Sequence, residues 1–248
     1  MKLAHALHVV GGGWTGFNIS GARDCHVYLL DGGSELALID SGLGLADDFS
    51  TILENIRADG LDPRRIRKII LTHYHADHIG AAREARSRLD AEVIASHGCA
   101  PAIRAGDELP MGLQIAKAAG VYPLDYHIPA CAVDRTVGEG DMIQIGALLL
   151  RTFDTPGHSD GHISFLLEGA DRTVLIGGDL VFWNGTILLQ NLPDCRIDAY
   201  ASSVAKVATL DFDALLPGHG QISLRGGAEH ARKADRAFKS LLIPPNLL

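Results

Sequence analysis

The chain has 248 residues, of which 47% are hydrophobic and 21% are charged, and its net charge is −8. This composition is typical of a globular protein that buries a sizeable core. An acidic chain without a block of lysine or arginine is not expected to bind nucleic acid. No run approaches the roughly 18 apolar residues of a transmembrane helix. Residues 1–10 also lack the long apolar region of a signal peptide.

These features predict a cytoplasmic protein that acts on a small molecule, without nucleic acid or membrane partners. The four cysteines are widely spaced and form no Cys-x-x-Cys pair, so we expect reduced, partly buried thiols. They are Cys25, Cys99, Cys131 and Cys195. The sequence leaves the oligomeric state open.

The first half of the chain alternates strands with helices. Apolar runs at 26–30 and 35–39 flank an Asp-Gly-Gly-Ser segment and predict a β-hairpin. Phe49, Ile52 and Ile56 then recur at helical spacing, with Gly60 as a stop signal. The remaining elements predicted in this half are a strand at 66–71, a helix at 77–89 and a strand at 92–95.

Residues 97–129 contain four prolines among helical fragments and are predicted to be an insertion with one or two helices. The elements expected after it are strands at 142–153, 163–167, 173–176 and 214–216, and helices at 197–207 and 231–241. Asp198 is the expected N-cap of the first of these helices.

Strands dominate both halves of the chain, and each half ends with helices. This order favours an α+β fold in which two sheets pack face to face with helices outside. A polar site is then expected at one edge, on loops after the strands. No linker or repeat interrupts the chain, so a single domain over 1–248 is the simplest interpretation.

Three histidines and one aspartate stand within six residues, as His73-Tyr74-His75-Ala76-Asp77-His78. Imidazole and carboxylate are donors that zinc prefers, and they also suit iron and manganese. In an extended segment His73 and His75 point the same way. Asp77 and His78, at the start of the following helix, are aimed at a second point. The run therefore predicts two neighbouring metal ions.

Two ions need more ligands than one run supplies, and three further residues share a common context. Each follows a buried strand and a glycine, which lets the backbone approach an ion closely. They are His158 in Thr-Pro-Gly-His, Asp179 in Gly-Gly-Asp and His219 in Pro-Gly-His.

The complete pattern, His73-x-His75-x-Asp77-His78 followed by His158, Asp179 and His219, resembles the metallo-β-lactamase superfamily. The resemblance implies a four-layer αββα sandwich and a site for two divalent metal ions, most simply Zn²⁺. Its implied ligands are His73, His75 and His158 for one metal and Asp77, His78 and His219 for the other, with Asp179 bridging them. The turn at Ile39-Asp40-Ser41-Gly42 implies that Asp40 supports the ligands from behind.

The predicted function is hydrolysis of a small ester-like acyl bond, a lactone or a thioester. Metal ions lower the pKa of a bound water, to about 7 for a single zinc, and stabilise the developing oxyanion. The resulting hydroxide is expected to attack the carbonyl, with Asp77 or Asp179 passing a proton to the leaving group. The loop at 155–162 resembles that of glyoxalase II-like thioesterases and homoserine-lactone hydrolases.

Three alternatives remain open from the sequence. A persulfide dioxygenase-like oxygenase with a single iron uses a similar motif. A phosphodiesterase or nuclease fits the same metal chemistry, although a basic groove is missing. A non-catalytic binding protein on this fold is the third, although such proteins usually lose ligands and none is missing here.

Residues for the substrate pocket are predicted from position alone. Tyr74 stands inside the metal motif, and Phe182, Trp183 and Asn184 follow Asp179 closely. Trp14, Tyr122 and the 97–129 insertion are interpreted as a cover over the site, and His162 as a supporting residue rather than a ligand.

Overall fold

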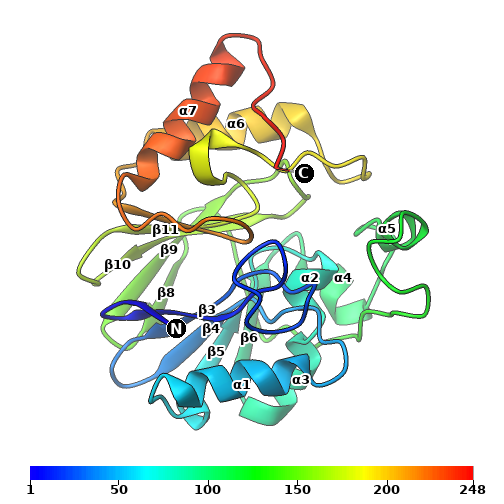
Figure 1. Ribbon diagram of the computed structural model, residues 1–248, viewed down its shortest axis with the longest axis vertical. Helices are drawn as coiled ribbons and strands as arrows, with labels where there is room; N and C mark the ends of the chain where they lie inside the picture. Colours follow the sequence, from blue (N-terminus) through cyan, green and yellow to red (C-terminus); the bar gives the residue numbers. More distant parts are fainter. Residues whose placement is uncertain (248) are drawn as a thin grey trace.

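The structure, a computed structural model, describes residues 1–247 and contains two β-sheets that face each other (Figure 1). The first sheet has the order β1-β2-β3-β4-β5-β6-β7 and the second the order β12-β11-β10-β9-β8. The strands of the first sheet are β1 (Lys2–Ala4), β2 (Leu7–Gly11), β3 (Val27–Asp31), β4 (Leu36–Ile39), β5 (Ile66–Ile70), β6 (Glu92–Ser96) and β7 (Arg135–Val137). Those of the second are β8 (Met142–Ile145), β9 (Leu148–Asp154), β10 (Ile163–Glu168), β11 (Val174–Gly178) and β12 (Ala214–Pro217).

Helices cover the outer faces of both sheets. The α-helices are α1 (Asp48–Ala58), α2 (Ala76–Ile79), α3 (Ala82–Leu89), α4 (Ala100–Ala105), α5 (Leu113–Ala118), α6 (Ile197–Ala208) and α7 (Gly227–Lys239). Short 3₁₀ turns lie at Pro63–Arg65 and Trp183–Gly185. Figure 1 places α1 and α3 beside the first sheet and α6 and α7 beside the second.

Successive side chains of a strand point to opposite faces of the sheet, and this divides the core into layers. In β3, Leu29 packs in the cluster that includes the α1 residues Phe49 and Ile52, whereas Tyr28 and Leu30 pack between the sheets. A third cluster lies between the second sheet and helices α6 and α7. The predicted four-layer αββα sandwich is therefore confirmed, because a strand with both faces buried requires a layer on each side.

Several predicted elements differ in detail. The helix expected at 77–89 is two helices, because the N–H of Ala81 bonds to the carbonyl of Gly42 instead of continuing the helix. The strand expected at 142–153 is a hairpin that turns at Gly146, whose φ is +54°. Asp198 is not the N-cap of α6, since Arg196 occupies that position and the helix begins at Ile197.

Strands β1, β2 and β7 were not predicted, and the final helix begins earlier than the expected residue 231. Helices α4 and α5 lie within residues 97–129. All four cysteines are free thiols, as expected. Within residues 1–247, no helix is long and apolar enough to cross a membrane.

The strand directions bring the chemistry-bearing residues to one edge. Strands β4 and β5 are parallel, and so are β11 and β12, whereas β10 runs antiparallel to both β9 and β11. The carboxyl ends of β4, β5, β9, β11 and β12 therefore meet at the same edge of the sandwich. The segments that follow them carry every ligand that the sequence predicts.

Candidate metal centre

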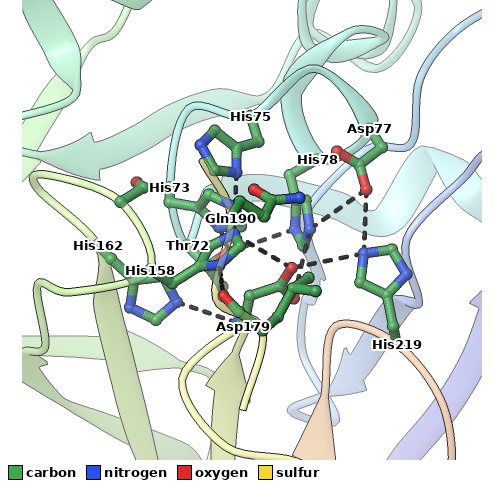
Figure 2. A network of polar contacts seen from close by, with 12 residues as sticks. Thr72, His73, His75, Asp77, His78, His158, His162, Asp179, Gln190 and His219 are labelled. Atoms are coloured by element: carbon green, nitrogen blue, oxygen red, sulfur yellow. Dashed lines mark hydrogen bonds and ion pairs between the residues drawn. The ribbon is translucent and has the colours of Figure 1, made fainter. Parts of the chain in front are cut away.

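Seven candidate ligands converge at this edge from both sheets (Figure 2). The side-chain donor atoms of His73, His75 and His158 lie within 4.8 Å of one another. A second group with donor atoms equally close is formed by Asp77, His78 and His219. These are the two sets that the sequence resemblance implies.

Asp179 lies between the two groups. Its Oδ2 is 3.4 Å from His158 Nε2 in the first group and 3.5 Å from His219 Nε2 in the second. Its Oδ1 is 3.6 Å from His78 Nε2. A carboxylate that reaches both groups is placed to bridge two cations.

The histidines are held from behind by hydrogen bonds that direct one ring nitrogen into the site. His78 Nδ1 lies 2.8 Å from Asp40 Oδ2, which leaves its Nε2 facing the site. Asp40 also accepts from the Thr72 N–H at 2.8 Å, so the carboxylate is fixed at both oxygens. His158 Nδ1 donates to the Leu188 carbonyl at 2.9 Å.

Asp194 supports His75 in the same way, and the sequence did not predict it. The Nε2 of His75 lies 3.0 Å from Asp194 Oδ2, so the lone pair of His75 is on Nδ1. Asp194 follows no strand and stands in no ligand motif, and it meets His75 only through the fold. Such a partner fixes the tautomer and ring orientation of a metal-binding histidine.

Two observations indicate that the site fits metal ions. His158 Nε2 and His75 Nδ1 approach to 2.9 Å, yet the hydrogen bonds behind them leave a lone pair on each. A cation satisfies two facing lone pairs, whereas a hydrogen bond between them does not. In addition, His73 Nε2, His78 Nε2 and Asp179 Oδ1 are buried atoms without a hydrogen-bond partner among residues 1–247.

Burial also favours the ligand form of two of the histidines, His73 and His158. It lowers the pKa of His158 to about 4 and that of His73 well below its ordinary value. Both rings are therefore neutral near pH 7, and neutral imidazole is the form that binds metal.

Glycine positions let Asp179 enter the site. A Cβ on Gly218 would collide with Asp179 Oδ1, and one on Gly178, whose φ is +51°, would meet His162 Nε2 at 2.6 Å. That His162 nitrogen accepts from the Asp179 N–H at 3.0 Å. The structure thus places His162 behind Asp179 and not among the ligand atoms.

A residue of the 97–129 segment reaches the site directly. The hydroxyl of Tyr122 donates to Asp77 Oδ1 at 2.9 Å, while Asp77 Oδ2 lies 3.0 Å from His219 Nε2. Tyr122 therefore does more than cover the site, because it orients a candidate ligand.

A cavity of about 860 Å³ opens onto these groups. Its walls come from four segments distant in the sequence: residues 14–23, residues 111–122 around α5, residues 188–192 and Leu247. Trp14 and Tyr122 line it, as expected, together with His75, Asp77, His158, Asp179 and His219.

The residues expected to form the pocket around Asp179 lie elsewhere. Phe182 is fully buried, and the Trp183 ring packs edge-on against the His230 ring, with 4.9 Å between the ring centroids. Asn184 Oδ1 accepts from Lys233 at 2.6 Å. Tyr74 is buried, and its hydroxyl donates to the Pro110 carbonyl at 3.4 Å. None of the four lines the cavity. For the three residues after Asp179 the reason is that the chain turns outward there and packs against α7.

The αββα sandwich thus carries at one edge a cluster of imidazoles and carboxylates, the donor types that bind divalent metals. The sequence model of the metallo-beta-lactamase superfamily matches residues 20–219, and the chain belongs to this superfamily. The predictions of the superfamily and of its fold are confirmed.

Two curated proteins are similar in sequence to this chain. A hydroxyacylglutathione hydrolase of Nitrobacter hamburgensis is 27% identical over 186 residues, which cover 67% of this chain and 60% of the relative. An atrochrysone carboxyl ACP thioesterase of Aspergillus fumigatus is 27% identical over 216 residues, covering 87% of this chain and 56% of the relative. The chain thus spans between 44% and 61% of the length of the hydroxyacylglutathione hydrolases to which it is similar.

Solved structures share the fold. A metallo-beta-lactamase of Cronobacter sakazakii aligns with a TM-score of 0.75 at 22% identity, covering 97% of this chain and 96% of that one. A subclass B3 metallo-beta-lactamase of Bradyrhizobium japonicum aligns with a TM-score of 0.72 at 24% identity, covering 97% and 91%.

Proposed function

We propose that the protein is a metal-dependent hydrolase that cleaves a small ester-like acyl bond, a thioester or a lactone, at a two-metal site. One metal is held by His73, His75 and His158 and the other by Asp77, His78 and His219, with Asp179 bridging them. The observation that carries the proposal is the pairing of inward-facing lone pairs with hydrogen bonds behind them, as at His75 and His158.

Divalent cations bound there supply electrophilic catalysis and lower the pKa of a water. The protein's own side chains orient the metal-binding rings and transfer a proton. Asp40 and Asp194 hold the His78 and His75 rings in the required tautomers. Asp77 faces the cavity with Oδ1 bound by Tyr122, so it is the group placed to carry a proton to the leaving group.

Two observations favour an acyl substrate. Among residues 1–247, the cavity lining is largely apolar, as at Met111, Leu113 and Ile115. This described lining includes Arg23 but not the row of Lys and Arg that a nucleic acid backbone requires. The names of the relatives, hydroxyacylglutathione hydrolase and ACP thioesterase, also favour an acyl thioester.

The test combines metal analysis with a substrate panel. The purified protein is loaded with zinc, its metal content is measured, and it is assayed against an acyl-glutathione thioester, an acyl-homoserine lactone, a β-lactam and bis-nitrophenyl phosphate. We expect about two metals per chain and turnover of the thioester or lactone.

A matched pair of variants serves as the control. His75→Ala is expected to lose metal and activity, whereas His5→Ala, at an exposed histidine outside the site, is expected to retain both. One iron per chain with oxygen uptake on a persulfide would contradict the proposal in favour of an oxygenase. Strong phosphodiester turnover with no acyl hydrolysis would instead favour a phosphodiesterase.

A further inference from the structure

The loop at residues 12–24 is a firmly built part of the cavity. Its two arms pair through Gly13 N–H to the Asp24 carbonyl and Trp14 N–H to the Ala22 carbonyl, both at 2.9 Å. The Asp24 carboxylate, buried beneath the loop, accepts from Leu43 N–H at 2.8 Å and from Ser20 Oγ. What the loop presents to the cavity is therefore held in place.

The same loop is joined to the metal centre. Thr15 Oγ1 lies 2.9 Å from His219 Nδ1, and the Gly220 N–H donates to the Thr15 carbonyl at 2.6 Å. Groups on this loop consequently have a fixed relation to the candidate ligand His219.

Arg23 is the charged group that the loop presents. Its neighbour Asp24 points inward, and the Arg23 side chain is exposed and lines the cavity. No hydrogen bond or ion pair to the Arg23 side chain occurs among residues 1–247. Lys117 of α5 differs, since it is buried and paired with Glu108 at 3.4 Å.

The other residues that line the cavity leave the Arg23 guanidinium without a neighbouring basic group. Among the described residues that line the cavity, Arg23 is the single arginine or lysine, and the acidic groups are Asp77 and Asp179 of the metal centre. The Trp14 side chain, 67% exposed, and apolar side chains of the α5 region such as Ile115 and Val121 form much of the remainder. An unpaired guanidinium in an apolar cavity favours a carboxylate or phosphate.

We propose that the cavity takes a substrate with an apolar acyl group and one anionic group that pairs with Arg23. This rests on the proposed function and narrows it to amphiphilic anionic acyl esters. The reacting carbonyl lies at the metal centre, the apolar part lies between Trp14 and α5, and the anion lies at Arg23.

The kinetic test uses octanoyl thioesters of three thiols: neutral N-acetylcysteamine, 3-mercaptopropionate and 2-mercaptoethyl phosphate. A monothioester of suberic acid places the anion on the acyl side instead. For the zinc-loaded protein we expect kcat/KM to be about 5- to 30-fold higher for at least one anionic ester than for the neutral one. The preferred ester shows whether Arg23 binds a carboxylate or a phosphate, and whether that anion belongs to the acyl or the thiol part of the thioester.

Arg23→Gln is expected to abolish that preference, with kcat/KM for the anionic ester falling to the value for the neutral one. Arg225→Gln, at an exposed arginine outside the cavity, is the matched control and should keep it. Raising the salt concentration should reduce the preference in wild type, because exposed charges are screened. Equal rates on neutral and anionic esters would overturn the inference and leave the proposed function standing.

Absence of hydrolysis for every ester would overturn the proposed function. The assignment of Arg23 as the anion-binding residue would then be tested separately, by a binding measurement. The chain has two tryptophans, and Trp183 lies outside the cavity. In Trp183→Phe, the fluorescence of Trp14 reports binding of 3-(octylthio)propionate or its methylamide to the metal-free protein. We expect Arg23→Gln to weaken binding of the carboxylate about fivefold or more and not that of the amide. An equal effect on both ligands, or none, would overturn the inference.

Discussion

At the scale of single residues, the fold itself fixes the tautomer of His75, His78 and His158. A carboxylate or carbonyl behind the ring fixes which nitrogen carries the proton, as Asp40 does for His78 and Leu188 for His158. The ring then needs little reorganisation when it binds a cation. The residues behind the ligands should consequently matter nearly as much as the ligands.

The first prediction concerns Asp194. Asp194→Ala removes the acceptor of the His75 Nε2–H and is expected to weaken metal binding about 10- to 100-fold. Asp194→Asn keeps an oxygen acceptor and should recover part of the loss. Competition with a chromophoric chelator measures the affinity. Asp211→Ala, whose side chain is 98% exposed, is the control, and an unchanged affinity in Asp194→Ala would refute the role.

A second prediction concerns pH and Asp24. Burial raises the pKa of this carboxyl from 3.8 to about 6, partly offset by the hydrogen bonds from Ser20 and Leu43. The folded state therefore binds this proton more tightly than the unfolded state. The resulting stabilisation is complete below pH ~4 and is lost as the pH rises through about 6, by about 3 kcal/mol for a shift of about two units.

Asp24→Asn cannot titrate, so its free energy of unfolding should lack this component of the pH dependence. Urea unfolding of both proteins between pH 4 and 7.5 measures the difference. We expect wild type to lose stability relative to the variant as the pH rises through 6. Parallel curves for the two proteins would contradict the prediction.

The sequence predicts the ligands and the supporting residues Asp40 and His162, but it misses Asp194, for a physical reason. His73 to His78 form one contiguous run, and Asp179 and His219 follow glycines after apolar strands, so local patterns reveal them. Asp194 lies 119 residues from His75, and no local pattern joins them. The expectation for Phe182 and Trp183 rested on nearness to Asp179 in sequence, whereas the direction of the chain after that residue decides what they contact.

At the scale of elements, the segment around α5 both lines the cavity and reaches a ligand. Met111 and Ile115 contribute apolar surface, and Tyr122 bonds Asp77. The proline-rich pattern of 97–129 predicted helices without indicating which face meets the site. That face depends on contacts with segments far along the chain, which hydrophobic spacing alone does not encode.

A third prediction tests this connection. Tyr122→Phe keeps the ring and loses the hydroxyl that donates to Asp77 Oδ1. We therefore expect the affinity for the metal assigned to Asp77, His78 and His219 to fall about three- to tenfold, with an unchanged fold. Tyr126→Phe is the matched control, because its hydroxyl donates to the Leu43 carbonyl at 2.9 Å instead. Isothermal titration with zinc measures both. Equal losses in the two variants would indicate a general effect on the segment.

At the scale of the whole molecule, the candidate ligands join the two sheets. His73 to His78 follow β5 of the first sheet, and Asp179 and His219 follow β11 and β12 of the second. Bound cations would therefore connect the two halves of the sandwich at the edge where the site lies, in addition to the apolar core between the sheets. Metal binding and folding stability should be coupled.

The fourth prediction is that chelation lowers the thermal midpoint. A metal at 100 times its Kd stabilises the folded state by about 2.7 kcal/mol, which corresponds to several degrees for a chain of this size. Asp179→Ala, which removes the bridging carboxylate, should shrink this difference and reduce hydrolysis by orders of magnitude. Trp183→Phe should behave as wild type. Calorimetric scans with and without chelator provide the measurement, and an unchanged midpoint in wild type would contradict the coupling.

Because the cavity walls come from four separate segments, substrate recognition in such a protein can evolve separately from the core. The ligands stand directly after core strands, where substitutions disturb the sandwich. The walls come from connections at 14–23, 111–122 and 188–192. Mutation in these connections can therefore alter substrate recognition without replacing a candidate ligand, provided that Thr15 and Tyr122, which contact His219 and Asp77, are kept. Replacing these three connections with those of a related hydrolase, while keeping Thr15 and Tyr122, is accordingly a direct experimental route to a new substrate range.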